Sequence, residues 1–187
     1  MLNSAVDSIV QELNQFIGMK FQTDEDVVIL SNLMNLDGTV AATEKNKIIV
    51  SVINIQEDKI AHNNSGKAKG SGTYPPIYLN VYLLMSANFD EKLNKESLKF
   101  LSAVVAFFQG KKVFTPSDSP ILDSNIEKLV VEIENLDFHQ QSNVFSFLGA
   151  KYMPSIFYKM RMIAIEEESG DYTPGLISEK GMDSSLD

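Results

Sequence analysis

Two long stretches of the chain, residues 75–88 and 154–165, begin at a proline and then alternate between apolar and amphipathic positions. A period of two places successive side chains on opposite faces of a strand. Proline at the start imposes an extended entry. In the first stretch Tyr78, Asn80 and Tyr82 fall on one face. We therefore predict two long strands, which together would build a broad surface.

Other apolar runs predict three shorter strands and three helices. Runs rich in Val and Ile favour strands, and apolar residues spaced three and four apart favour helices. The strands are predicted at residues 27–30, 47–55 and 129–135, and the helices at about residues 4–17, about residues 91–109 and between Asp137 and Gly149. Asp37-Gly38 is a turn signal between the first two strands.

Capping residues predict where these helices begin and end. Ser4-x-x-Asp7 is placed to cap the first helix, and Gly18 to end it. Asp90 precedes the second helix and Gly110 follows it. For the short helix, Asp137-x-x-Gln140 matches a capping box and Gly149 is placed to stop it.

The second helix carries two apolar stripes instead of one. Its first stripe should face the core, and its second extends the apolar surface beyond what one sheet can cover. Two explanations remain open for the second stripe: deeper burial within the same domain, or contact with another subunit. The first stripe is Leu101, Val104, Val105 and Phe108, and the second is Phe100, Ala103 and Phe107.

The order of elements describes an α+β fold with a mixed, mainly antiparallel sheet. A chain of 187 residues with 44% hydrophobic residues fits one domain with one core, which we place at residues 1–168. The glycine-rich segment 62–74 should be a mobile loop. Residues 169–187 lack periodicity and should form a flexible tail.

Composition excludes several classes of partner. The net charge is −9, and seven acidic residues against one basic residue lie in residues 166–187. An acidic chain repels phosphate backbones, and Lys67 and Lys69 are too few for a basic patch, so nucleic acid is not expected as a partner. No run approaches the roughly 20 apolar residues that span a bilayer, and no targeting signal is visible; we expect no membrane insertion.

Residues for catalysis or metal binding are scarce. There is no cysteine, and no nucleophile-elbow, zinc-protease or P-loop motif occurs. His62 and His139 stand apart from other ligand residues. The acidic groups Asp24–Asp26 and Glu57-Asp58 lack the spacing of a calcium loop and are better explained as solvated charge. We therefore predict no catalytic residue, no metal and no cofactor.

Lys159 and Arg161 are two residues apart in the middle of the second long strand, so they point to the same side. Burying two bases without partners would be costly. Either they face water, or they pair with the carboxylates of Glu132 or Glu134 or with acidic residues of a neighbouring subunit.

Four blocks of the chain, in order, resemble the cap or tail-terminator proteins of bacterial contractile injection systems, which are phage-tail-like particles. The resemblance covers about residues 2–165, and its blocks are residues 54–58, 75–85, 101–109 with 113–114, and 148–161. Two positions depart from the family pattern: Ala150 stands where a second glycine is common, and Met153 where a base often precedes the proline. Some relatives carry a further C-terminal domain, whose contacts cannot be carried over to this chain.

The resemblance implies a non-enzymatic structural cap. Such a protein forms a six-fold ring on the last ring of the inner tube and contacts the end of the contractile sheath. Its partners would be copies of itself, the tube protein and the sheath protein. It would be made in the bacterial cytoplasm and then become part of the particle.

We select eight residues as candidate interface positions because they are basic residues of the glycine-rich loop, residues of the exposed strand faces, or residues of the second helix stripe. They are Lys67, Lys69, Tyr78, Tyr82, Phe100, Phe107, Lys159 and Arg161. Two alternatives remain: a baseplate or tube adaptor of the same kind of particle, and a small hydrolase or ligand-binding domain built on Tyr78, Asn80 and Tyr82.

Overall fold

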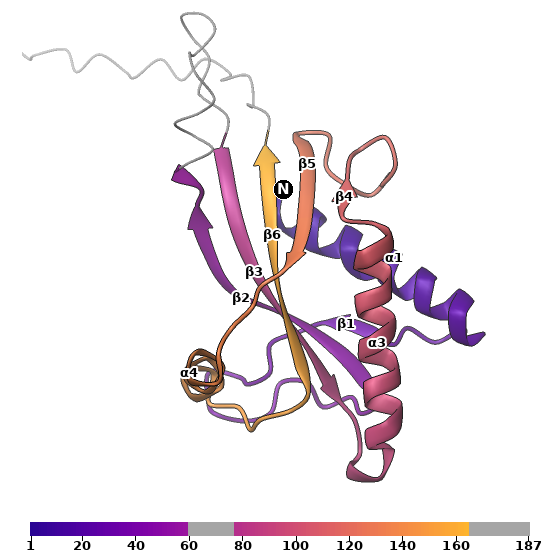
Figure 1. The fold of residues 1–187 in the computed structure, drawn as a ribbon, viewed down its shortest axis with the longest axis vertical. Helices are drawn as coiled ribbons and strands as arrows, with labels where there is room; N and C mark the ends of the chain where they lie inside the picture. Colours follow the sequence, from indigo (N-terminus) through magenta and orange to yellow (C-terminus); the bar gives the residue numbers. More distant parts are fainter. Residues whose placement is uncertain (60–76, 165–187) are drawn as a thin grey trace, which may run out of the picture.

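The computed structural model describes residues 1–59 and 77–164, and their fold is built on a curled six-stranded sheet (Figure 1). The strand order is β1-β2-β3-β6-β5-β4. Strand β1 runs parallel to β2, and the other neighbours are antiparallel. The predicted α+β fold with a mixed, mainly antiparallel sheet is confirmed. The predictions for the 62–74 loop and for the tail fall outside the described residues.

The elements follow one another in an order close to the prediction. The strands are β1 (Val28–Leu30), β2 (Lys47–Glu57), β3 (Ile77–Asn88), β4 (Val113–Phe114), β5 (Ile126–Ile133) and β6 (Ser155–Ala164). The helices are α1 (Leu2–Phe21), the 3-10 turn η1 (Glu91–Leu93), α3 (Asn94–Gly110) and α4 (Phe138–Leu148). None of the helices in the described part of the chain is both long and apolar enough to cross a membrane.

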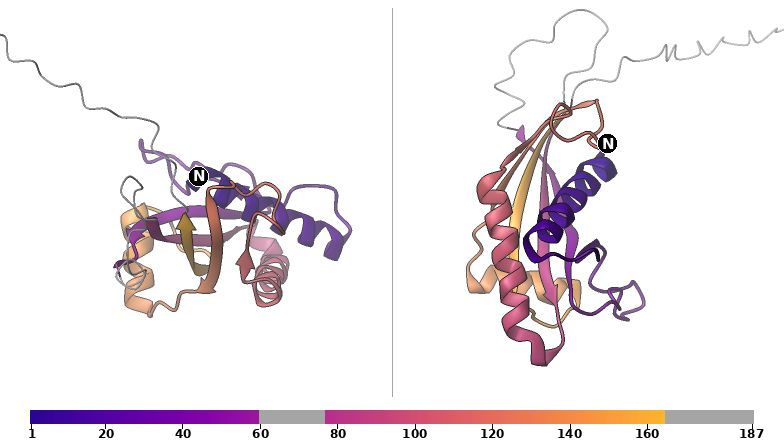
Figure 2. Two further views of the ribbon diagram at one scale, coloured as in Figure 1. Left: turned by 90° about the horizontal axis from the view of Figure 1, so that it is seen from above. Right: turned by 90° about the vertical axis from the view of Figure 1, so that its right-hand side faces the viewer.

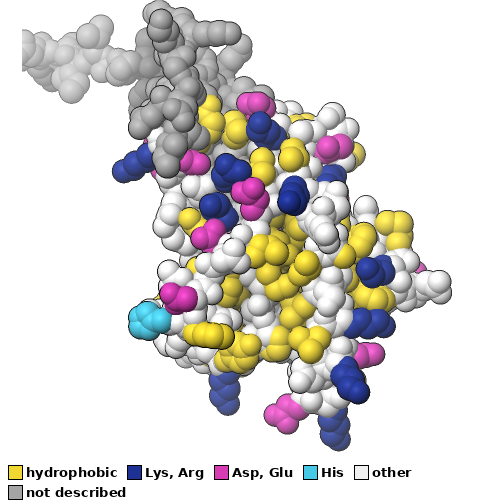
Figure 3. Space-filling view, in the orientation of Figure 1, with side chains coloured by type: hydrophobic (Ala, Val, Ile, Leu, Met, Phe, Trp, Pro, Cys, Tyr) yellow, Lys and Arg dark blue, Asp and Glu magenta, His cyan; other side chains and the backbone are white. Residues whose placement is uncertain are grey.

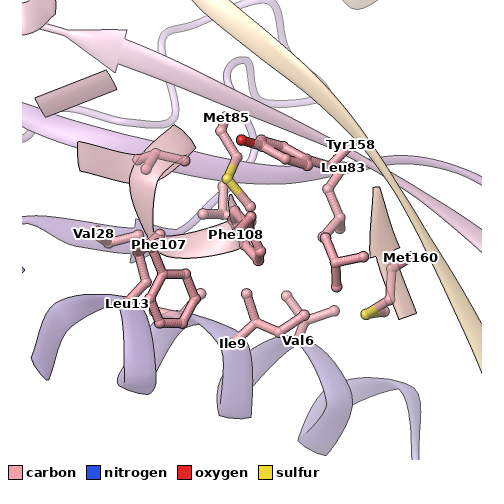
Figure 4. Close-up of a cluster of buried hydrophobic side chains, with 14 of the residues drawn as sticks. Val6, Ile9, Leu13, Val28, Leu83, Met85, Phe107, Phe108, Tyr158 and Met160 are labelled. Carbon is pink, nitrogen blue, oxygen red and sulfur yellow. The ribbon is translucent and has the colours of Figure 1, made fainter. Parts of the chain in front are cut away.

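Helices cover the two faces of the sheet unequally. Figure 2 shows α1 and α3 on one face and the shorter α4 on the other. The core under α1 and α3 takes alternate residues of the strands, as the period of two predicts. Figure 4 shows Leu83, Met85, Tyr158 and Met160 of the sheet meeting Val6, Ile9 and Leu13 of α1 and Phe107 and Phe108 of α3.

A second, smaller core lies on the opposite face. Leu84 of β3 and Phe157 of β6 point to this side and contact Phe145 of α4. Residues 31–46 complete the cover with Leu33 and Ala42. Helix α4 and this segment reach over only part of the face, and no other described residue covers the rest.

The helix limits show where local signals were overridden. The predicted end of α1 at Gly18 is wrong: the helix continues to Phe21 and ends at Gln22, which takes the left-handed conformation with φ 56°. The predicted Ser4 cap is also wrong, because Met1 is the cap residue and the Ser4 hydroxyl donates to the Met1 carbonyl. The longer helix lets Phe21 pack edge-on against Phe100 of α3, a contact that a helix ended at Gly18 could not make.

Of the two remaining predicted N-terminal caps, the one at Asp90 is wrong and the one at Asp137 is confirmed. Asp90 makes no side-chain cap, and its carboxylate instead accepts a hydrogen bond from Lys45 at 2.7 Å. The Asp137 capping box is confirmed, with the Gln140 backbone N–H donating to Asp137 and the Gln140 side chain accepting from the Asp137 N–H. Gly149 ends α4 with φ 65°, as predicted.

Candidate functional site

Four of the eight candidate interface residues come together on the open part of the sheet. Tyr78 and Tyr82 lie on β3, and Lys159 and Arg161 lie on β6. The β3–β6 register places Tyr82 beside Lys159 and Asn80 beside Arg161. Lys67 and Lys69 fall outside the described residues. The structure therefore joins the two proline-led strands into one surface, which we call the open face.

Bases and acids pair across the open face. Lys159 lies 3.6 Å from the Glu134 carboxylate, and Arg161 donates to Glu132 at 3.1 Å. The side chains of Lys159 and Arg161 are 29% and 45% exposed. Pairing within the subunit is thus the correct alternative, and the paired groups still reach water.

Lys159 forms its ion pair with a residue other than the one directly opposite it on β5. In the β5–β6 register Lys159 faces Glu132, yet it forms its ion pair with Glu134. A long side chain reaches a diagonal neighbour on the next strand as readily as the residue directly opposite. Glu132 is thereby left to Arg161, so each base has one acid and the centre of the open face is close to neutral.

A shallow hollow of about 200 Å³ lies at one end of the open face. Its lining includes Tyr78, Arg161 and Lys128. Lys128 was missed because the strand was predicted to begin at residue 129, whereas β5 begins at Ile126. The hollow is smaller than the roughly 300 Å³ at which small-molecule sites usually begin. It does not support the ligand-binding alternative.

The hydrolase alternative also finds no support in the geometry of the open face. The Tyr82 hydroxyl donates to the side-chain oxygen of Gln56 at 3.3 Å, and the Oδ1 atom of Asn80 has no partner among the described residues. No group of three His, Cys, Asp or Glu side chains able to hold a metal occurs within residues 1–59 and 77–164. His139 lies exposed on α4, far along the chain from Tyr82.

Phe100 and Phe107, which belong to the second stripe of α3, face α1 and not an outer surface. Phe107 is 7% exposed and packs 5.5 Å from Phe16, ring centre to ring centre. Phe100 lies between the rings of Phe21 and Phe89. Deeper burial within the domain is therefore the correct explanation, and these two residues have little surface left for another subunit.

Two surfaces outside the predicted set stand out. Helix α4 leaves large aromatic side chains in solvent: Phe138 is 91% exposed and Phe147 65%. A hollow of about 410 Å³ lies between α3 and the strands β5 and β6, with Val105, Val131 and Ile133 in its lining. In Figure 3 hydrophobic side chains gather in this hollow below the charged upper part of the surface. The sequence does contain a signal for the exposed aromatic residues of α4, because Phe138, Phe145 and Phe147 cannot all point to one face of a helix.

Tyr158 forms part of the lining of the same hollow. Its ring centre lies 4.6 Å from that of Phe108, with the two ring planes tilted by 43°, and the residue is fully buried. Burial raises the pKa of the Tyr158 hydroxyl far above its ordinary value, and that hydroxyl has no hydrogen-bond partner within the described residues. Tyr158 is thus a neutral, apolar wall and not a proton donor poised for chemistry.

Comparison with known proteins gives one family and two similar structures. The Pvc16 N-terminal domain family model matches residues 5–179. The PVC sheath/tube terminator of an extracellular contractile injection system, in its extended state, is 10% identical with a TM-score of 0.52 and is aligned over 95% of this chain. The tube-terminating cap of the anti-feeding prophage is 14% identical with a TM-score of 0.53, over 93% of this chain. No curated protein is significantly similar in sequence.

The chain spans about three fifths of the two similar structures, covering 63% of the first chain and 58% of the second. At these identities the likeness shows that the fold is shared.

Proposed function

Because the chain belongs to the Pvc16 N-terminal domain family, we propose that it is a structural cap, which terminates the inner tube and holds the end of the sheath in a phage-tail-like contractile injection particle. The family match over residues 5–179 is the observation that carries the proposal. The shared fold with a sheath/tube terminator and with a tube-terminating cap supports it.

The physical character of the chain supports a binding role without chemistry. The open face is part of an antiparallel sheet in which Lys159 and Arg161 are already paired with acids. A partner that binds such a surface does not have to bury unpaired charge, which is the expensive step in forming an interface. Tyr78 and Tyr82 add aromatic area, which interfaces favour.

Assembly as a ring would let a small subunit end a polymer. A subunit that matches the tube end on one side and offers no tube-like surface on the other makes further addition unfavourable. We propose a six-fold ring of this chain, seated on the last tube ring and in contact with the sheath, with the open face as one partner surface. The protein would be assembled in the bacterial cytoplasm and would leave the cell as part of an extracellular particle.

Deletion of the gene tests the proposal through particle length. We expect sheaths and tubes of irregular length, or few intact particles, in electron micrographs of a deletion strain, and restored lengths when the full chain is supplied again. Wild-type length distribution and yield in the deletion strain would contradict a capping role.

A further inference from the structure

Helix α4 has the composition of an interface and the exposure of a free surface. Its residues Phe138–Leu148 include no Lys, Arg, Asp or Glu. Only Phe145 is buried, whereas Phe138, Phe147 and the nearby Tyr152 project into solvent. Protein interfaces are enriched in aromatic side chains and depleted of charge at their centres, and exposed apolar groups of this kind mark binding sites. Phe138 and Phe147 are nine residues, or two and a half turns, apart, so they lie on opposite sides of α4. Phe147 points away from the buried Phe145. We call the exposed side of α4 around Phe147 the knob.

The hollow between α3 and the strands β5 and β6 offers a largely apolar lining for such a side chain. Val105, Val131 and Ile133 line it together with the buried rings of Phe108 and Tyr158. We call it the groove. Its volume of about 410 Å³ exceeds the space that one aromatic side chain needs.

The groove exists because the neighbouring strand is short. Strand β4 pairs with β5 only at Val113–Val130 and Phe114–Leu129, and the Val131 N–H then donates to the Lys112 carbonyl at 2.8 Å. Beyond this point no described residue pairs with the outer edge of β5, and Ile133 is 48% exposed. An apolar surface and a short free strand edge therefore lie side by side.

Charge favours a second copy of this chain as the occupant. The chain has a net charge of −9, so copies repel unless they meet at surfaces with few acids. The knob has none within the helix, and the one acid of the groove, Glu132, is already paired with Arg161. Lys112 at the groove has no ion-pair partner among the described residues. An unpaired base at the groove favours an acidic partner, such as a second copy of this chain.

We propose that the knob of one copy, with Phe147 at its centre, docks into the groove of the next copy. Knob and groove are different surfaces, so the contact is head-to-tail, and it builds the proposed ring when the rotation between neighbouring copies closes. This inference rests on the proposed ring and names the surfaces that build it. An aromatic side chain that fills an apolar pocket is the usual centre of such a contact.

Disulfide trapping tests the contact, because the chain has no cysteine of its own. In the full chain assembled on particles, Phe147→Cys combined with Ile133→Cys should convert most subunits into a ladder of covalent multimers under mild oxidation. The two single variants, mixed in equal amounts, should give covalent dimers only. Met19→Cys with Ile133→Cys is the control, because Met19 is 78% exposed on α1 and away from the knob. It should stay monomeric.

Several outcomes would overturn the proposal. Multimers no more abundant than in the control would do so, as would trapping that stops at the dimer in the double variant, or disulfides formed only with a cysteine placed in the tube protein. Phe147→Asp gives a second readout: we expect loss of ring assembly with an unchanged circular dichroism spectrum. If particles have normal length without the protein, the capping function fails; if lengths are irregular but no ladder forms, only the knob and groove contact fails.

Discussion

Helices α1 and α4 pack on opposite faces of the same sheet and differ in what they leave in solvent. Helix α1 buries nearly its whole apolar stripe, with Ala5, Ile9, Leu13 and Ile17 at 0% exposure. Helix α4 buries Phe145 and leaves Phe138 and Phe147 exposed. Apolar residues that a fold hides stabilise that fold, whereas apolar residues that it leaves outside are available to a partner. We therefore expect α1 to determine stability and α4 to determine assembly.

The largest expected effect is on α1. Leu13→Ala removes a fully buried side chain from the core between α1 and the sheet, and it should lower the free energy of unfolding by about 2–5 kcal/mol. Urea unfolding followed by circular dichroism measures the loss. The matched change on α4, Phe147→Ala, should alter stability by less than about 0.5 kcal/mol because the side chain is exposed. Equal losses of unfolding free energy at the two positions would contradict the proposed difference between α1 and α4.

The capping box of α4 should have a smaller effect. Asp137→Ala removes the side chain that accepts the Gln140 N–H, and it should lower stability by about 1 kcal/mol. Amide hydrogen exchange should increase mainly in residues 138–148. Ser142→Ala, at an exposed position of the same helix, is the control and should leave exchange unchanged. Faster exchange throughout α1 as well would show that the two helices are not independent.

The ion pairs of the open face should contribute still less. Arg161→Glu places a second acid beside Glu132, so we expect a loss of less than about 1 kcal/mol, because both side chains are about half exposed. The double change Arg161→Glu with Glu132→Arg should recover most of it in a double-mutant cycle. No recovery in the cycle would mean that the pair does not act as a unit.

Low pH should weaken the contact between the Met1 amine at the start of α1 and the Asp123 carboxylate. The pKa of Asp123 lies below its ordinary value of 3.8 because the Asn125 N–H and the N-terminal amine of Met1 donate to its carboxylate. A lowered folded-state pKa stabilises the protein above pH 3.8 and loses that contribution as the pH falls through the folded value. Melting temperatures measured from neutral pH downward should therefore fall less steeply in Asp123→Asn. Identical curves for the two proteins would argue against this effect.

Periodicity in the sequence predicted five of the six strands in the described sheet and missed the two-residue β4 and the start of β5. Local signals did not predict how the helices meet. The strand faces of β3 and β6 follow from their alternation, since the period of two leaves no other arrangement. The end of α1 did not follow from Gly18, because aromatic packing with α3 outweighs a stop signal of about 1 kcal/mol.

The candidate interface residues also fall into two groups: those that strand alternation places and those whose position depends on how the helices pack. Alternation alone places Tyr78 with Tyr82, and Lys159 with Arg161, on shared strand faces. Phe107 was placed on a candidate interface because a sequence does not show that α1 will lie against α3. The groove depends on where β4 ends relative to β5, a register that is set across the irregular connection 115–125, and no local pattern records it.

The position of the protein within the particle tests the central claim most directly. Cryo-electron microscopy of purified particles, with the chain carrying a density label, should show one ring of label at the end distal to the baseplate. Label along the shaft or at the baseplate would contradict the proposal that this chain terminates the tube.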